Sequence, residues 1–380
     1  MQKNNFKVGI IGFGFIGKVH ALGYWSLPYA YNNPPVSARV TALLRTSTGR
    51  DEELLHQIGN PYVTDSIEDF ANQDLDLIDI CTPNALHLVE IGVMLQKKVP
   101  LYCEKPLGLN LAHARTILKL AEKAGVLTHT AFMMRYYPAV RQAKAILAAG
   151  RLGEIFHFRA QYFHSSYTDP NKPTSWRLRN NMAGGGAMAD LGVHGIDLLL
   201  YLLGDAAWVQ GRFRTLIKQR PLSKGSSEST QVDVDDWGIC LLGMKNGAIG
   251  SLEASRMGGG ASDNPKIEIF GSQGSLIIDL NTPLQVAFFD EKQKQIHFGT
   301  FDFPTPEGER PIPEIWPSGK TTLGSFQDAH TASIYDFLLN INEKKDSAIN
   351  FKTAVYAQEI LEAAYLSNSR NGQTISLPLD

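Results

Sequence analysis

Short apolar runs alternate with longer amphipathic segments over the first third of the chain. Apolar positions recur at helical spacing in the segments between the runs, including 86–97 and 110–124. The runs have the length of buried strands and cover residues 8–11, 39–44, 77–81, 99–103 and 126–132. Strands that alternate with helices are typical of a parallel sheet covered by helices. We therefore expect an α/β Rossmann domain over residues 1–131.

The rest of the chain shows a different pattern. Residues 155–163 alternate, with Phe156, Phe158, Ala160 and Tyr162 on one face and His157, Arg159 and Gln161 on the other. Turn residues at 245–247 and 271–274 separate further strand-like runs, which predicts two hairpins. Neighbouring hairpins indicate an antiparallel sheet, and helix-like segments close the chain. We expect an α+β domain over residues 132–380, with a large, mostly antiparallel open β-sheet.

A glycine turn follows the first predicted strand. Gly12, Gly14 and Gly17 have the spacing G-x-G-x-x-G and enclose Phe15 and Ile16. A strand before this motif and a helix after it are the context of a dinucleotide site, in which the helix N-terminus faces the phosphates. The same glycines could form a plain surface turn. The position of the motif after a buried strand favours nucleotide binding.

The end of the second strand carries information about the cofactor. In a dinucleotide fold an acid at this point binds the ribose hydroxyls. Here Arg45, Thr46 and Ser47 follow the strand, and the first acid is Asp51. An arginine with hydroxyls suits a 2′-phosphate, so the sequence leans towards NADP over NAD. Alternatively, Arg45 is a solvated loop residue.

Two more strand ends carry polar clusters. Thr82, Pro83 and Asn84 follow the third of the five runs, and Glu104 and Lys105 follow the fourth. Ligands of open parallel sheets bind at the carboxyl ends of strands, so these clusters are expected in one site. Lys105 is either half of an ordinary surface ion pair with Glu104 or a lysine held beside the nicotinamide.

A second polar centre lies after the glycines at 184–186. On a helix, Asp190, His194 and Asp197 would occupy one face, at positions i, i+4 and i+7. A carboxylate one turn from an imidazole can orient it and raise its pKa, which suits proton transfer. The alternatives are a hydrogen-bonded core histidine and a metal site. Because no third ligand stands near in the sequence, we expect no metal.

Composition narrows the classes of partner. The 380 residues include 36 Lys and Arg against 38 Asp and Glu, a net charge of −2. This balance gives no support to a nucleic-acid or membrane partner. The richest apolar run, around residues 198–203, is too short to cross a bilayer, and we expect no signal peptide before the first strand. Three scattered cysteines suggest a reducing compartment, so we expect a cytoplasmic protein.

Together these motifs resemble the glucose–fructose oxidoreductase/inositol dehydrogenase (Gfo/Idh/MocA) family. The resemblance covers essentially the whole chain. The matching residues are Gly12-x-Gly14-x-x-Gly17, Thr82-Pro83-Asn84, Glu104-Lys105-Pro106, Trp176-Arg177 and Asp190-x-Gly192-x-His194. The resemblance implies a Rossmann domain, a second domain with a large open sheet, and oxidation or reduction of a secondary alcohol on a sugar, polyol or sugar derivative.

The resemblance also implies roles for single residues. Lys105 matches the family's catalytic lysine, His194 its general acid/base, and Asp190 the carboxylate beside it. The positions implied to bind the cofactor include Thr82, Pro83, Asn84, His87 and Glu104, and Trp176 and Arg177 near the mouth of the site. Arg45 departs from the acid of many relatives, which puts NAD in doubt.

These expectations define an NAD(P)-dependent dehydrogenase or reductase that acts on CH–OH groups of a small sugar-like molecule. An NAD-dependent glycosidase of the same fold, or a nucleotide-sensing regulator without turnover, are the alternatives. Helices on one face of the second sheet leave its other face to be covered, so we expect a homodimer or homotetramer.

Overall fold

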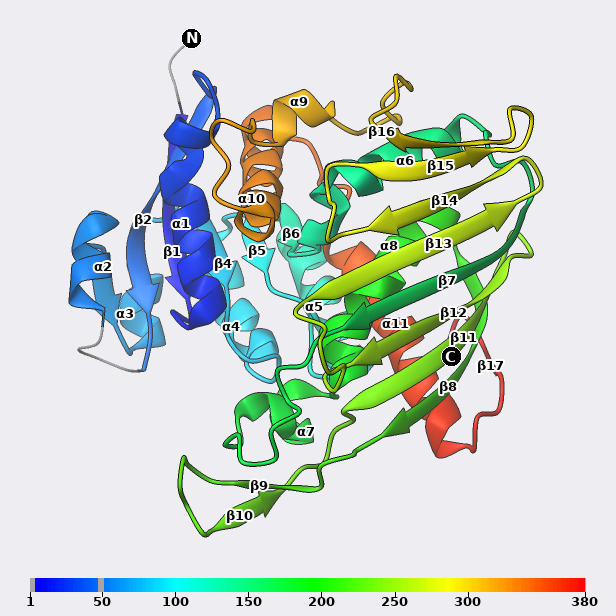
Figure 1. The fold of residues 1–380 in the computed structure, drawn as a ribbon. Helices are drawn as coiled ribbons and strands as arrows, with labels where there is room; N and C mark the ends of the chain where they lie inside the picture. Colours follow the sequence, from blue (N-terminus) through cyan, green and yellow to red (C-terminus); the bar gives the residue numbers. More distant parts are fainter. Residues whose placement is uncertain (1–3, 47–50, 380) are drawn as a thin grey trace. The chain divides into compact units, whose positions relative to one another are not determined.

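The computed structural model describes residues 4–46 and 51–379. The chain forms two compact units, which we treat separately (Figure 1). Unit 1 contains residues 1–108, 112–136 and 310–355. Unit 2 contains residues 109–111, 137–309 and 356–380.

Unit 1 is built on a parallel sheet of six strands in the order β3-β2-β1-β4-β5-β6. Its strands are β1 (Asn4–Ile11), β2 (Val36–Leu44), β3 (Tyr62–Thr64), β4 (Leu77–Ile80), β5 (Leu101–Cys103) and β6 (Thr128–Thr130). Successive strands are added on one side of β1 up to β3 and then on its other side from β4 onward. This is the doubly wound order of dinucleotide-binding domains. The predicted Rossmann domain is confirmed.

The helices of unit 1 surround this sheet. They are α1 (Phe15–Ala30), α2 (Glu52–Gln57), α3 (Ile67–Ala71), α4 (His87–Met94), α5 (Leu111–Ala124), α9 (Ile312–Ile315) and α10 (Ser325–Glu343), with single turns at η1 (Leu95–Lys97) and η2 (Met133–Tyr136). Helix α1 continues through Pro28. Its buried face packs against α10, and the rings of Tyr31 and Tyr335 stack at 3.8 Å between centroids.

The grouping of α10 with the first unit differs from the expected domain boundary. The expectation placed all residues after 131 in one domain, whereas residues 310–355 belong to unit 1. The physical reason is close packing of α10 on α1. A Cβ added to Gly23 would lie only 2.8 Å from Ile334, so the two helices approach at a residue without a side chain.

Unit 2 contains a sheet of nine strands in the order β16-β15-β14-β13-β7-β12-β11-β8-β17. The strands are β7 (Ile155–Phe163), β8 (Ala206–Arg214), β11 (Trp237–Met244), β12 (Ile249–Ser255), β13 (Asn264–Gly271), β14 (Gly274–Asp279), β15 (Val286–Asp290), β16 (Gln295–Gly299) and β17 (Ile375–Ser376). Strands β7 and β12 pair in parallel, and the other neighbours are antiparallel. The predicted α+β class and both hairpins are confirmed. A separate ribbon joins β9 (Gln219–Pro221) to β10 (Ser229–Gln231).

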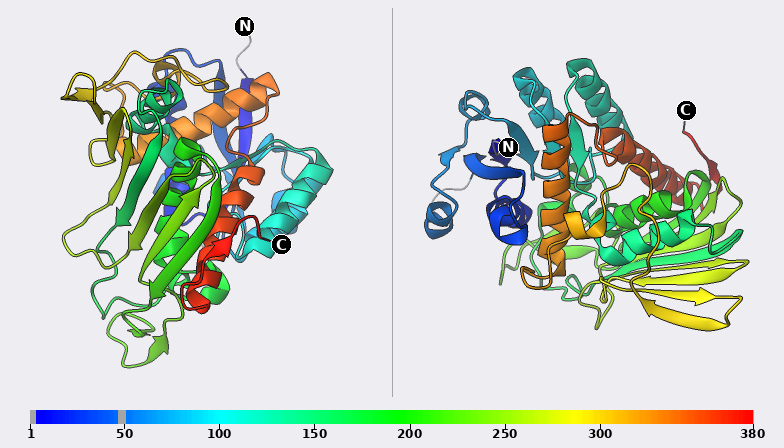
Figure 2. Two further views of the ribbon diagram at one scale, coloured as in Figure 1. Left: turned by 90° about the vertical axis from the view of Figure 1, so that its right-hand side faces the viewer. Right: turned by 90° about the horizontal axis from the view of Figure 1, so that it is seen from above.

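Three helices of unit 2 lie on one side of the nine-stranded sheet, as Figures 1 and 2 show together. They are α6 (Pro138–Ala148), α8 (Val193–Leu203) and α11 (Phe351–Ser369), which belongs to unit 2 from residue 356 onward. Helix α11 reaches β8, where the backbone N–H of Gly211 donates to Ser367 Oγ at 2.9 Å. Alternate strand residues, among them Phe158 and Leu252, are buried beneath these helices.

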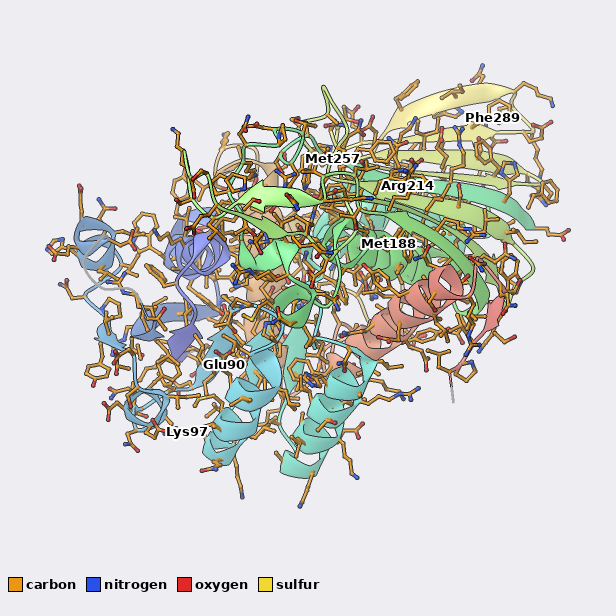
Figure 3. All side chains as sticks on the ribbon, turned by 90° about the horizontal axis from the view of Figure 1, so that it is seen from below. Glu90, Lys97, Met188, Arg214, Met257 and Phe289 are labelled. Atoms are coloured by element: carbon orange, nitrogen blue, oxygen red, sulfur yellow. The ribbon has the colours of Figure 1, made fainter. Side chains whose placement is uncertain are left out.

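The other face of this sheet carries a mixed apolar surface. The register places Leu241 beside Ser251, and Ala287 beside Phe298. Phe298 is 75% exposed, Ile296 56% and Ile249 50%. Arg214 at the end of β8 and Phe289 of β15 are labelled in Figure 3, which draws every described side chain. The described helices of the unit therefore leave large apolar side chains of this face uncovered.

One stretch has the length and hydropathy of a membrane-crossing helix. It runs from Asn180 to Leu203 with a mean hydropathy of 1.3, longer than the run weighed from the sequence. Because 78% of its apolar window is buried inside the protein, it is equally explained as a core segment, and it is weak evidence for a membrane.

Candidate active site

The glycine turn between β1 and α1 has the geometry that a dinucleotide site requires. Gly12 has φ +90°, and its N–H donates to the carbonyl of Leu44 at 2.9 Å. A Cβ at Gly17 would lie 2.1 Å from the Gly12 oxygen, so this position accepts only glycine. A Cβ at Gly14 would meet no described atom within 4 Å. The backbone at Gly14 is thus open to a ligand, while Gly12 and Gly17 close the turn. Phe15 is 71% exposed and begins α1, with Ile16 beside it.

Arg45 lies directly after β2 and is buried, so it is not a solvated loop residue. Its guanidinium forms an ion pair with Asp51 at 3.1 Å, and Lys18 of α1 binds the same carboxylate at 2.6 Å. The hydrogen bond and charge of Lys18, followed by the charge of Arg45, lower the pKa of Asp51. An acid therefore does lie beside Arg45, and it is Asp51, six residues further along the chain. Thr46 is exposed, and Ser47 lies outside the described residues.

The turn after β4 is held from both sides. Thr82 donates its hydroxyl to the buried Glu90 of α4 at 2.5 Å. Burial raises the pKa of Glu90 to about 7, although the Thr82 hydrogen bond opposes the shift. His87 is fully buried, and its two ring nitrogens face the carbonyls of Thr82 and Leu107 at 3.0 and 3.1 Å. His87 therefore joins two strand-end turns instead of presenting its ring at the surface. Pro83 is half-buried and Asn84 is buried in the same turn.

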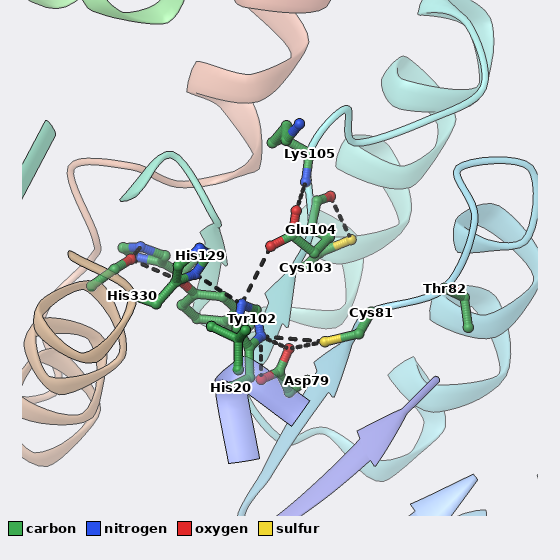
Figure 4. Close-up of polar contacts among 12 residues, drawn as sticks. His20, Asp79, Cys81, Thr82, Tyr102, Cys103, Glu104, Lys105, His129 and His330 are labelled. Carbon is green, nitrogen blue, oxygen red and sulfur yellow. Dashed lines mark hydrogen bonds and ion pairs between the residues drawn. The ribbon is translucent and has the colours of Figure 1, made fainter. Parts of the chain in front are cut away.

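The turn after β5 carries Glu104 and Lys105 (Figure 4). Glu104 is 8% exposed and accepts the backbone N–H of Lys105 at 3.2 Å. Its other oxygen lies 3.3 Å from Nε2 of His20, which projects from the buried face of α1. Pro106 follows Lys105 through a cis peptide bond. Glu104 is thus an internal anchor of the lysine's turn and not half of a solvent-exposed pair.

Two buried groups in unit 1 place possible metal-binding atoms within 4.8 Å of one another. They are His20 with Glu104 and His330, and His20 with Asp79 and Cys81. Both groups share His20, whose Nδ1 already faces Asp79 at 2.9 Å. Hydrogen bonds and ion pairs account for these distances, so we assign no metal to either group.

In unit 2, one carboxylate organises the glycine-rich segment. Asp235 accepts the backbone N–H groups of Gly186 and Met188, each at 2.8 Å, and the hydroxyl of Tyr365 at 2.6 Å. A Cβ at Gly186 would lie 1.8 Å from the Asp235 carbonyl oxygen, which explains the glycine. This contact fixes the start of the helical segment that follows.

Asp190 and His194 lie in that segment but not on one regular helix. Asp190 belongs to a π-helical turn, η4 (Met188–Gly192), and His194 and Asp197 belong to α8. His194 is 5% exposed, and its ring centroid lies 6.2 Å from that of Tyr162 in β7. Gly195 has no side chain because a Cβ would meet Leu252 of the sheet at 2.4 Å. Gly195 thus serves the packing of α8 on β12.

Asp190 has a partner that the sequence did not indicate. Arg256, buried to 1% exposure at the end of β12, donates to Asp190 Oδ2 at 3.1 Å and to the carbonyl of Arg177 at 3.2 Å. Arg177 lies over the ring of Trp176 at 4.4 Å, in the short helix η3 (Trp176–Leu178). Arg256 therefore links Asp190 to the Trp176–Arg177 pair. Its only sequence signal is an arginine at the end of an alternating strand.

These features define a dinucleotide-dependent oxidoreductase with a second, sheet-containing domain. Two conserved-sequence profiles match the chain: "Oxidoreductase family, NAD-binding Rossmann fold" over residues 6–132 and "GFO/IDH/MocA C-terminal domain" over residues 140–277. The chain belongs to the Gfo/Idh/MocA oxidoreductase family, as the sequence motifs predicted.

Relatives with assigned names match over most of their length. Levoglucosan dehydrogenase of Pseudarthrobacter phenanthrenivorans is 28% identical and aligns over 98% of each chain. Myo-inositol 2-dehydrogenase of Thermotoga maritima is 25% identical over 75% of this chain and 79% of its own. A solved structure of levoglucosan dehydrogenase in complex with NADH superposes with a TM-score of 0.89 at 28% identity, over 99% of this chain and 100% of the other.

Proposed function

We propose that this protein is an NAD(P)-dependent dehydrogenase or reductase of a secondary alcohol on a sugar, polyol or sugar derivative. The observation that carries the proposal is the glycine turn, closed at Gly12 and Gly17 and open at Gly14, in a chain that also keeps Lys105, Asp190 and His194. The names of the relatives, a levoglucosan dehydrogenase and an inositol dehydrogenase, support a sugar-like substrate.

The residues of unit 1 fit a nicotinamide dinucleotide. The N-terminus of α1 and the backbone at Gly14 would hold the pyrophosphate, because free N–H groups and the helix dipole favour anions there. Arg45 and Asp51 would face the adenosine ribose, and the turns at 82–84 and 104–105 the nicotinamide end. When bound, the cofactor accepts or donates the hydride, and the protein supplies position and proton handling.

Lys105 and His194 handle the proton in this proposal. A hydroxyl that loses a hydride must also lose a proton, and a positioned base must accept it. His194 acts as general acid/base and Lys105 donates a hydrogen bond to the reacting oxygen. Asp190, oriented by Arg256, is the carboxylate that works with His194.

For the cofactor we propose a modest preference for NADP over NAD. Arg45 and Thr46 at the end of β2 support it, because a guanidinium matches a phosphate. The pairing of Arg45 with Asp51 weakens the preference, since a 2′-phosphate must compete with that carboxylate. We also propose a cytoplasmic location, which the three free, buried cysteines support.

Net turnover tests the proposed function and separates it from the rival functions. Sugars, anhydrosugars and inositols are offered with NAD and NADP in parallel, and reduced nicotinamide is followed by absorbance. The proposal expects cofactor reduction in step with consumption of one substrate class. A glycosidase would release a free sugar with no net reduction, and a sensor would bind cofactor without consuming any substrate. Either result contradicts the proposal.

A further inference from the structure

A buried charge cluster lies beneath the turn that carries Lys105 (Figure 4). Asp79 of β4 and Glu104 after β5 are 0% and 8% exposed, and the fully buried His20 of α1 contacts both. His20 Nδ1 lies 2.9 Å from Asp79 Oδ2, and Nε2 lies 3.3 Å from Glu104 Oε1. The helix that begins at the glycine turn is thereby tied to two neighbouring strand ends.

The partners of this cluster favour an imidazolium at His20. Asp79 accepts a hydrogen bond from Nδ1, so this nitrogen carries a proton, and Nε2 lies at ion-pair distance, 3.3 Å, from Glu104 Oε1. Burial alone lowers the pKa of His20, but the charge and hydrogen bond of Asp79, together with contact to Cys81, outweigh it and raise the pKa well above its ordinary value. His330 Nδ1, 3.2 Å from His20 Nε2, then serves as an acceptor.

Glu104 transmits this arrangement to Lys105. One carboxylate oxygen meets His20, and the other accepts the backbone N–H of Lys105 at 3.2 Å. The Glu104 backbone N–H donates to Ile80 of β4 at 2.9 Å. With one oxygen held by a hydrogen bond and the other by the charge of His20, the carboxylate has one favoured orientation, and so has the backbone that presents Lys105. Without His20, a buried carboxylate would lose its cationic partner.

We propose that His20 is a positioning residue of the reaction, which holds Glu104 and through it the turn that presents Lys105 to the nicotinamide end of the cofactor. The inference rests on the proposed function and adds to it a residue outside the catalytic set. It separates the two halves of the cofactor: the pyrophosphate is held at Gly12–Gly17, and His20 acts only on the nicotinamide end.

The test uses two substitutions of His20 and a matched control. His20→Asn keeps a donor near Asp79 and loses the contact with Glu104, whereas His20→Gln can still reach Glu104 without a charge. Tyr24→Phe is the control, because Tyr24 donates to the same Asp79 at 3.0 Å but does not touch Glu104. Thermal unfolding establishes that each variant is folded.

Binding of ADP and fluorescence of bound NADH report separately on the two halves of the cofactor. His20→Asn should leave the Kd for ADP within about twofold and change the fluorescence of bound NADH. It should lower kcat by roughly ten- to a hundredfold, as misplacement of a reacting group does, with little change in the KM for cofactor. His20→Gln should recover part of this loss, and Tyr24→Phe should behave as the parent. Unaltered NADH fluorescence and kcat in folded His20→Asn would overturn the inference.

A double-variant cycle tests the route through Glu104. If His20 acts through Glu104, the double variant His20→Asn/Glu104→Gln should be no less active than the less active of the two single variants. Both changes remove the same contact between His20 and Glu104. Losses that multiply would show independent roles and contradict the proposal. If the parent itself binds neither ADP nor NADH, the proposed function fails. If the parent binds them and the His20 variants behave as the parent, only the inference about His20 fails.

Two measurements that need no His20 variant decide the matter even if those variants do not fold. Histidine-labelled protein should show a side chain with both ring nitrogens protonated at pH 8, which shifts in Glu104→Gln. A neutral ring at this position contradicts the proposal. Elemental analysis supplies the second measurement, and the proposal expects no bound metal. One equivalent of zinc that is lost in Glu104→Gln but retained in Tyr24→Phe would make the cluster a metal site. That result would contradict the proposal, because an imidazolium has no free nitrogen to bind a metal.

Discussion

Arg45 and Asp51 meet at the end of β2, and their pairing shows how one side chain alters the interpretation of another. The sequence has an arginine where a dinucleotide-binding fold commonly has an acid. In the structure Asp51, six residues further along the chain, forms an ion pair with this arginine. The hydrogen bond from Lys18 and the charge of Arg45 keep the pKa of Asp51 low, so the carboxylate remains charged. Cofactor choice therefore depends on a pair and not on Arg45 alone.

Substitution of Arg45 and substitution of Asp51 should move the cofactor preference in opposite directions. Arg45→Asp removes the phosphate partner and should favour NAD. Asp51→Asn frees Arg45 and should favour NADP, with a change in the affinity ratio of about tenfold, as expected for a charge-assisted contact of 1.5–3 kcal/mol. Kd values for both cofactors in both variants provide the measurement. Ratios that stay at the parent value in both would remove the argument.

Glu90 provides a pH-dependent test of the turn at Thr82. Its pKa in the folded protein is about 7, above the ordinary 4.5, because burial favours the protonated form. The folded state thus holds a proton that the unfolded state releases, so this contribution is complete below about pH 4.5 and is lost as pH rises to 7. Glu90→Gln cannot lose that proton. It should be as stable as the parent at pH 4.5 and more stable at pH 8, by roughly 3 kcal/mol at most.

Urea unfolding at both pH values measures this difference. The matched control is Glu122→Gln on the exposed surface of α5, which should show no such pH dependence. Equal stabilities of Glu90→Gln and the parent at pH 8 would contradict the assigned pKa.

At the scale of elements, local patterns were sufficient for most of the fold. Apolar runs predicted five of the six parallel strands, all but the three-residue β3, alternation predicted β7, and turn residues predicted both hairpins, because each depends on a short stretch of chain. The partners of the site were not accessible in this way. Arg256 reaches Asp190 from 66 residues away, and His330 reaches His20 from 310 residues away. Such pairs arise only from tertiary packing.

The β1–turn–α1 element makes a prediction about two of its glycines. Gly14→Ala adds a methyl group where no described atom lies within 4 Å, whereas Gly17→Ala places one 2.1 Å from the Gly12 oxygen. Gly14→Ala should keep the thermal stability of the parent and weaken cofactor binding, because the methyl group occupies the approach of the pyrophosphate. Gly17→Ala should lower the thermal stability itself. The reverse pattern would show that the turn does not form the cofactor site.

At the scale of the whole molecule, the uncovered face of the nine-stranded sheet bears on assembly. It carries exposed Phe298, Ile296 and Ile249, and charged pairs such as Arg159 with Glu268 lie among its strands. Exposed apolar patches of this kind commonly mark interaction sites. We propose that a second copy of the chain covers this face.

Sedimentation tests that assembly at micromolar concentration. The parent should sediment at a multiple of its 41.9 kDa monomer mass. Replacing Phe298 and Ile296 with lysine should shift it towards the monomer, while the same change at exposed Leu86 of unit 1 should not. A parent that sediments only as a monomer contradicts the proposal.

The measurement that tests the central claim most directly compares turnover with cofactor binding in His194→Ala and Lys105→Met. Proton transfer by positioned groups contributes a hundredfold or more, so each variant should lose roughly that factor in kcat. The Kd for the oxidised cofactor should change little in His194→Ala, because the phosphates are held at Gly12–Gly17. Near-full turnover in His194→Ala would contradict the account: His194 would then be a structural histidine, and the proton would pass through Lys105 or water alone.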